Sequence, residues 1–363
     1  MEKILSIDNG YGYVKTALLE EGKSKVHKTI FPSLVDHISH PYTIIKDTSA
    51  FLDPLGKGEI DKHIFFSTKE FPSFSVGRGA SAEFSFALES ELIRPLSIVK
   101  PLFLSALAIN SLKYSVFQAP VIYITPIGMA ETERERLSSH FVGKHNITVN
   151  GIISKNITFN VPSVYFVEQG IASFIDVLYS FKDNGDLQSR EINGRTLVLD
   201  IGVNTLNIAV LENLRLLYRE TFPKLGTYKF IEDLLSLLKS KGIVLTKSEI
   251  QDMMQTWTFI VKRISPETLQ EEELDLTEFA NSEKKKVFKS IIEPRIKTIL
   301  TDFQVKNVVL TGGGAKLFNI SPNFIIPEDP QFSNSIGALK MYILFSNTLE
   351  SSKKKGKEPN DIP

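Results

Sequence analysis

The chain has 363 residues, 42% hydrophobic and 23% charged, which is enough for about two domains that each bury a core. Lys and Arg number 42, as do Asp and Glu, and this balance argues against direct binding of nucleic acid by a basic surface. The chain contains no cysteine, which excludes disulfides and thiolate metal sites. The first apolar segment predicts a strand rather than a signal peptide, and we find no apolar run long enough to span a membrane. We therefore expect a cytoplasmic protein.

The first half of the chain predicts strands followed by helices. Its first 36 residues predict two or three strands with a turn at Gly22. The next segment, rich in Pro, Gly and aromatic residues, predicts a small insert with short strands at 64–66 and 74–76. Apolar periodicity then predicts a helix over 101–114, a buried strand over 121–125, a charged helix over 131–141, strands around 147–161 and a helix over 168–181.

The second half repeats this pattern after a polar segment. Residues 182–195 predict a linker between domains. The following elements are strands over 196–221, helices over 226–241, 247–263 and 277–301, a strand over 308–310 and a helix over 335–345. Strand-rich segments followed by helices, occurring twice, predict an α/β fold with a mixed sheet in each half.

Two strand-turn segments carry the chemistry. Each apolar strand ends in an Asp followed by a Gly-containing turn, Asp8 before Asn9-Gly10-Tyr11-Gly12 and Asp200 before Ile201-Gly202. A third strand ends in Thr311 and three glycines, 312–314. We expect the turn glycines to reach positive φ, so that successive backbone N–H groups converge on phosphate oxygens. This predicts a nucleotide site.

The two carboxylates indicate a divalent cation. Asp8 and Asp200 would repel each other unless Mg²⁺, held largely through water, lay between them. Lys15 can reach back toward a terminal phosphate. A single turn of this type is most simply a hairpin. The ordered pair with the later glycines is more specific, and neither a P-loop nor a Rossmann glycine motif is present.

The ordered motifs resemble those of the actin-like ATPase superfamily, and within it the plasmid-segregation actins of the ParM type and small archaeal actins. They span nearly the whole chain in family order: Ile7 to Lys15, Phe31-Pro32-Ser33, Val76-Gly77, Thr125 to Gly128, Val167 to Ala172, Leu199 to Gly202, Leu225 to Tyr228, Leu310 to Ala315 and Pro330 to Gly337.

The resemblance implies two similar domains with a nucleotide between them. Domain I would comprise 1–181 and 327–346, with a small insert at about 37–95. Domain II would comprise 196–326, followed by a disordered tail over 347–363. The implied ligands are Mg²⁺ with ATP or ADP, and GTP is the alternative nucleotide. The implied nucleotide contacts are Asp8, Asn9, Gly10, Tyr11, Gly12, Lys15, Asp200, Gly202, Asn204, Thr205, Gly226, Gly312, Gly313 and Gly314.

The resemblance also implies a residue that positions the attacking water. We expect Glu168 to have this role, because it would begin the first connecting helix, and Gln169 is the neighbouring alternative. Without the family context, Glu168 would be an ordinary acid in a helix first turn.

Two residues depart from the family pattern. Val203 stands where a small residue is usual, and Asn207 replaces an acid. β-branched residues such as Val203 resist strained backbone conformations, and Asn207 removes a charge that could order a water or the lysine. We expect nucleotide binding to survive both changes, whereas the rate of hydrolysis is not predicted.

Three functions remain open. The first is a polymerising actin-like ATPase that segregates plasmid or phage DNA through a DNA-bound adaptor. The second is a small-molecule kinase of the same superfamily, and the third is a non-polymerising scaffold of the pilus or division type. Sugar kinases are usually longer and carry a catalytic Asp, which does not stand out here. Polymerisation follows only from the resemblance.

Overall fold

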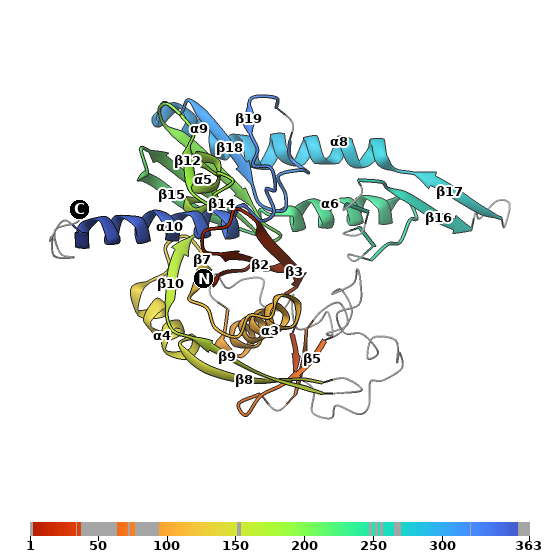
Figure 1. Cartoon of the computed structure of the whole chain (residues 1–363). Coiled ribbons are helices and arrows are strands. Elements are labelled where there is room, and N and C mark those ends of the chain that lie inside the picture. The colour runs from red at the N-terminus through yellow and green to blue at the C-terminus, as the bar shows by residue number, and fades with distance from the viewer. Residues whose placement is uncertain are drawn as a thin grey trace. The chain divides into compact units, whose positions relative to one another are not determined.

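The computed structural model describes residues 3–33, 35–37, 64–71, 73–76, 94–150, 154–246, 249–250, 253–254, 257–264, 270–319 and 321–354. The chain divides into two compact units (Figure 1). Unit 1 comprises Met1–Asn193 and Pro327–Pro363, and unit 2 comprises Gly194–Ile326.

Unit 1 is built on a five-stranded mixed sheet. Its strand order is β10 (Val164–Glu168), β7 (Val121–Thr125), β1 (Lys3–Asn9), β2 (Tyr13–Glu20) and β3 (Val26–Pro32). The first three are parallel, whereas β1, β2 and β3 form an antiparallel meander. Every residue of β7 is buried, as is typical of a central parallel strand. The three parallel strands therefore end at one edge.

Unit 2 repeats this topology. Its strand order is β19 (Phe324–Ile325), β18 (Asn307–Thr311), β13 (Thr196–Ile201), β14 (Thr205–Glu212) and β15 (Arg215–Pro223). β13 again has a parallel strand on one side and an antiparallel meander on the other. The predicted α/β fold is confirmed, and the two predicted Asp residues occupy equivalent positions in the two sheets.

A second sheet in unit 1 corrects the expected insert. Its order is β4 (Val35–His37), β6 (Phe74–Val76), β5 (Ile64–Ser67), β8 (Gly143–Asn150) and β9 (Lys155–Val161). The short strand predicted near 64 therefore pairs with a hairpin from much later in the chain, and the one near 74 pairs with that short strand on its other side. Local periodicity cannot reveal such pairing. Residues 38–63 and 77–93 of the expected insert lie outside the described residues.

Helix α3 (Leu96–Tyr114) packs between the two sheets of unit 1 (Figure 1). It begins five residues before the predicted start. The prediction began the helix at Pro101, because proline is favoured in a first turn, whereas the structure places Pro101 inside the helix. By length and composition α3 could cross a membrane, contrary to our expectation from the sequence. However, 67% of its apolar window is buried in the structure, as in a core helix.

The helix predicted over 168–181 is shorter than expected. α4 (Glu131–Phe141) has the predicted bounds, whereas α5 spans only Ile171–Leu178. Strand β10 continues to Glu168, and Gly170 then turns the chain with a φ of +75°. The aromatic residues after α5 form β11 (Tyr179–Phe181), which pairs with β12 (Leu187–Ser189) inside the predicted linker. This hairpin was missed because its strands have only three residues each.

Helix α10 (Ser333–Lys354) is longer than predicted at both ends. It continues eight residues into the segment expected to be a disordered tail. No Gly or Pro interrupts residues 338–355, and an established helix extends at little cost. Residues 355–363 lie outside the described part of the chain.

Unit 2 contains α6 (Thr227–Ser240), α8 (Thr277–Val287) and α9 (Glu293–Asp302). A π-helical turn, Phe288–Ile292, joins the last two, so the predicted helix over 277–301 is confirmed. The helix predicted over 247–263 is wrong at its end. Trp257 adopts a φ of +53°, and β16 (Ile260–Ile264) pairs with β17 (Glu271–Asp275). Residues 260–264 therefore form a strand because they pair with β17, not because of their own periodicity.

Helices α5 and α10 pack unusually closely within unit 1. A Cβ atom at Gly337 would lie 1.7 Å from the backbone oxygen of Ala172. One turn along α10, Lys340 donates to the Asp176 carboxylate at 2.5 Å and to the Tyr179 carbonyl at 2.7 Å. Burial raises the pKa of Asp176, against the opposing effect of Lys340. The close contact therefore depends on glycine.

We predict that Gly337→Ala destabilises the protein. Alanine favours helix by about 1 kcal/mol, but overpacking of a close contact typically costs about 1–3 kcal/mol, and here the contact is with a backbone atom. Thermal unfolding should show a lower Tm. Gly313→Ala is the control, because a Cβ there meets nothing within 4 Å. Equal Tm values for the two variants would contradict the packing argument.

Candidate functional site

The candidate site in unit 1 lies where the parallel strands β1, β7 and β10 end. Asp8 is next to Ile124 across β1 and β7, and Glu168 is next to Thr125 across β7 and β10. Asp8 is only 1% exposed although it is charged. In α/β sheets, ligands bind at the carboxyl ends of parallel strands.

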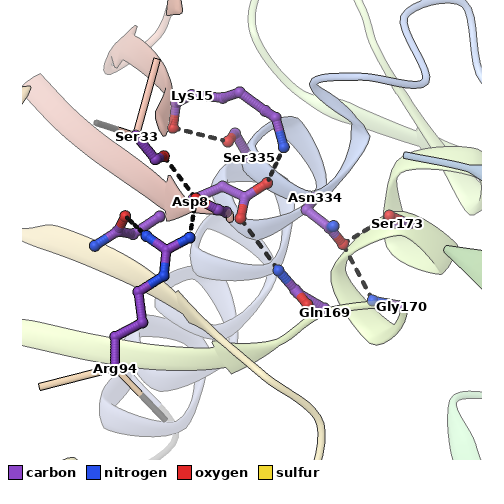
Figure 2. Close-up of polar contacts among 11 residues, drawn as sticks. Asp8, Lys15, Ser33, Arg94, Gln169, Gly170, Ser173, Asn334 and Ser335 are labelled. Carbon is purple, nitrogen blue, oxygen red and sulfur yellow. Dashed lines mark hydrogen bonds and ion pairs between the residues drawn. The ribbon is translucent and has the colours of Figure 1, made fainter. Parts of the chain in front are cut away.

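Two side chains hold the Asp8 carboxylate (Figure 2). Lys15 Nζ lies 3.1 Å from Asp8 Oδ2, and these residues are direct partners across β1 and β2. Gln169 Nε2 donates to Asp8 Oδ1 at 3.3 Å. The Gln169 backbone N–H donates to the Thr125 carbonyl at 2.9 Å, which fixes the turn after β10. Asp8, Lys15 and Gln169 therefore form one cluster.

Glu168 does not begin a helix, which corrects the position predicted for it. It is the last residue of β10, and it pairs with Arg134 of α4 at 2.9 Å. Arg134 also lies 3.7 Å from Glu131. Glu168 ends the strand, whereas Gln169 begins the turn that follows it. The Gln169 side chain contacts Asp8.

The turn between β1 and β2 is held by side chains from outside it. Ser33 Oγ donates to the Gly10 carbonyl at 2.6 Å, and Arg94 donates to the same oxygen at 2.8 Å. The Arg94 guanidinium lies 4.3 Å from the centre of the Tyr11 ring. Neither Gly10 nor Gly12 has the positive φ we expected. A Cβ at position 10 would lie 3.0 Å from the Tyr13 carbonyl oxygen, a tight contact that favours glycine there.

Asn9 is held on both sides. Arg94 donates to its Oδ1 at 3.4 Å, and its Nδ2 donates to the Tyr123 hydroxyl at 3.2 Å. Burial raises the pKa of Tyr123 to about 12, so this hydroxyl keeps its proton at neutral pH.

The start of α10 is attached to the same region (Figure 2). Asn334 Oδ1 accepts from the Gly170 N–H at 3.1 Å and from Ser173 Oγ at 2.7 Å. Ser335 Oγ donates to the Lys15 carbonyl at 3.4 Å. The turn that carries Gln169 is thereby connected to the start of α10.

In unit 2, Asp200 is the next-to-last residue of β13 and is 3% exposed. Gly312 follows β18 with a φ of +83°, and a Cβ there would lie 2.4 Å from Asp200 Oδ1. The Gly314 N–H donates to the Ile201 carbonyl at 2.8 Å. The triple-glycine turn therefore packs directly against the end of β13, as the order of the motifs suggested.

A second close contact joins the β13–β14 turn to α6. The N–H groups of Thr227 and Tyr228 donate to the carbonyls of Gly202 and Val203 at 2.9 and 2.8 Å. A Cβ at Gly226 would lie 2.3 Å from the Val203 carbonyl oxygen. Only glycine fits at position 226.

The two departures from the family pattern are accommodated locally. Val203 does not have a positive φ, so its β-branched side chain meets no backbone strain of that kind. Asn207 faces Asp200 across β13 and β14, and its Oδ1 accepts from Thr221 Oγ1 at 2.9 Å.

The structure groups the predicted site residues into two sets. In unit 1, Asp8, Asn9, Gly10, Tyr11, Gly12 and Lys15 surround one turn. In unit 2, the ends of β13 and β18 and the start of α6 bring together Asp200, Gly202, Asn204, Thr205, Gly226, Gly312, Gly313 and Gly314.

Arg94 was not among the site residues that we predicted from the sequence. It stands just before α3, and a basic residue is unfavourable near the positive end of a helix. This unfavourable position of a basic residue was the feature of the sequence that could have pointed to Arg94.

The donor set is compatible with a magnesium ion. Among the described residues no group of three or more His, Cys, Asp or Glu could hold a metal. Magnesium needs only one or two carboxylates when phosphates and water complete its shell. Each unit has one such buried carboxylate near a strand end, Asp8 in unit 1 and Asp200 in unit 2.

Comparison with known proteins supports an actin-like fold. Residues 6–171 match the family model described as actin like proteins N terminal domain. No curated protein sequence matches the chain.

Three solved structures cover nearly the whole chain. Actin-like protein Alp7A is 18% identical with a TM-score of 0.69, over 98% of this chain and 100% of that one. Ta0583, an archaeal actin homolog, is 19% identical with a TM-score of 0.67, over 95% and 100%. Bacillus thuringiensis ParM with ATP is 17% identical with a TM-score of 0.65, over 95% and 99%.

The chain also spans 48% of a hybrid Bacillus thuringiensis chain that contains two ParM mutants. The match over residues 6–171, the duplicated sheet topology and these solved structures together show that the chain has an actin-like fold, which ParM-type proteins share.

Proposed function

We propose that this protein is an ATPase that binds Mg-ATP through the turns of both units and assembles with copies of itself into filaments. The cluster of buried Asp8 with half-buried Lys15 and Gln169, at the end of three parallel strands, is the observation that carries the proposal. A carboxylate, a cation and an amide at one backbone turn suit a phosphate with its metal. The structure of ParM with ATP, a relative of the same fold, supports the choice of nucleotide.

Each unit would contribute a different part of the site. Lys15 and the turn after Asp8 would contact the terminal phosphates, while Asp8 and Asp200 would hold Mg²⁺ through water. The triple-glycine turn and Gly226 would lie against the adenosine, where larger residues would collide with the nucleotide. When bound, the metal would neutralise phosphate charge.

We propose Gln169, rather than Glu168, as the group that positions the attacking water. Gln169 donates to Asp8, whereas Glu168 is engaged by Arg134. A primary amide can donate through its N–H groups and accept through its carbonyl oxygen, so a side chain of this type can bridge a carboxylate and a water molecule. Phosphoryl transfer requires mainly such positioning together with charge neutralisation.

DNA segregation through a DNA-binding adaptor is the proposed cellular role, and it rests on the resemblance of the sequence motifs to plasmid-segregation actins. The small-molecule kinase and the non-polymerising scaffold remain the alternatives, which the assembly test below separates.

Asp8→Asn and Asp200→Asn should each weaken the binding of Mg-ATP by at least about tenfold, because each removes a charge that would hold the metal. Isothermal titration calorimetry measures this directly. Glu135→Gln, an exposed acid on α4, is the control. Unchanged affinity in both single variants would exclude a metal held by the two carboxylates.

Gln169→Ala should slow phosphate release by about 10²–10⁴-fold while leaving ATP affinity nearly unchanged, because a positioning group acts in the transition state. Glu168→Gln should affect the rate less. Single-turnover hydrolysis of radiolabelled ATP separates the two residues. A slow Glu168→Gln with a normal Gln169→Ala would return the role to Glu168.

ATP with Mg²⁺ should convert the protein from monomers into filaments, because a head-to-tail contact that does not close produces a helix. Light scattering and electron microscopy at micromolar concentrations, over a range of salt, test this. Sedimentation only as a monomer with ATP, ADP and a non-hydrolysable analogue would favour the kinase or scaffold alternatives.

A further inference from the structure

Arg94 is a polar residue of unit 1 to which the proposed function assigns no role. It lies immediately before α3, far from Asp8 in the sequence, yet its guanidinium is among the residues at the β1–β2 turn (Figure 2). It is partly buried, and desolvation lowers the pKa of its guanidinium, which nevertheless stays protonated at neutral pH. Placing a cation there costs free energy, so its contacts should provide compensation.

Those contacts all fall on the turn. One guanidinium nitrogen donates to the Gly10 carbonyl at 2.8 Å, and another lies 3.4 Å from Asn9 Oδ1. The planar group also covers the Tyr11 ring at 4.3 Å. Among the described residues, no carboxylate lies within ion-pair distance of Arg94. Arg94 therefore contacts three successive residues of one turn.

The direction of these contacts matters. In a planar trans peptide the carbonyl and the N–H of one unit point in opposite directions. When Arg94 and Ser33 hold the Gly10 carbonyl, the N–H of Tyr11 is fixed toward the other side. The Ser33 N–H similarly holds the Gly12 carbonyl at 2.9 Å, which fixes the N–H of Tyr13. Turn amides of this kind bind phosphate only when they are already oriented.

We propose that Arg94 is a positioning residue that presets the β1–β2 turn for phosphate without contacting the nucleotide. This rests on the proposed nucleotide site and adds the residue that orients its backbone donors. Arg94 also links the turn to the start of α3, the helix at the core of unit 1. Lysine cannot reproduce these contacts, because it lacks the planar group that reaches two acceptors and stacks on a ring.

The test compares ligands with and without phosphate. Arg94→Gln should weaken ATP and ADP by about tenfold, the size of one charge-assisted hydrogen bond, while adenosine binding is unchanged. Arg94→Lys should recover only part of the loss. Ser33→Ala removes the second donor to the Gly10 carbonyl, so the double variant should be non-additive. Arg136→Gln, an exposed arginine on α4, is the matched control.

A second measurement needs no nucleotide. Hydrogen exchange in the segment 9–15 should be faster in Arg94→Gln than in the wild type, with exchange in α3 and the thermal midpoint unchanged. Unaltered ATP and ADP affinity, or an equal loss for adenosine, would overturn the proposal. A wild type that binds no nucleotide would reject the proposed function, and the exchange rates would then decide separately whether Arg94 holds the turn.

Discussion

The buried charge of Asp8 is the constraint on which much of unit 1 depends. An isolated carboxylate that is 1% exposed would be very unfavourable, so its partners must be placed accurately. Lys15 is its direct cross-strand neighbour, and a slip of one residue between β1 and β2 would turn one side chain to the opposite face. The register of the meander, the end of β10 and the start of α10 are therefore all tied to one carboxylate.

The two units use the same sheet topology but stabilise their turns differently. In unit 1 the turn after Asp8 is held by side chains, from Ser33, Arg94 and Lys15. In unit 2 the turn after Asp200 is enclosed by backbone, with Gly226 and Gly312 at contacts too close for any Cβ. A substitution at one of these side chains would change one contact of the turn after Asp8. A substitution at Gly226 or Gly312 would instead force the backbone around the turn after Asp200 to move.

The difference between Glu168 and Gln169 shows the limit of motif reasoning. Both residues stand at the expected place, and a helix beginning at 168 would have favoured Glu168. The strand continues to Glu168 because β10 pairs with β7 along its full length, and Gly170 then turns the chain. Arg134, contributed by α4, engages Glu168, while Gln169 contacts Asp8. One residue of register changes the proposed catalytic group.

The sequence by itself determined the α/β class, the duplicated strand-turn segments and the ends of β1 and β13, because these follow from local apolar patterns and turn residues. It also indicated the triple-glycine turn after β18. Only the tertiary structure decided that β5 pairs with β8, that 260–264 is a strand, and that Arg94 reaches Gly10. Each of these depends on contacts between distant segments, whose free energy is gained only when the chain has folded and which no local pattern records.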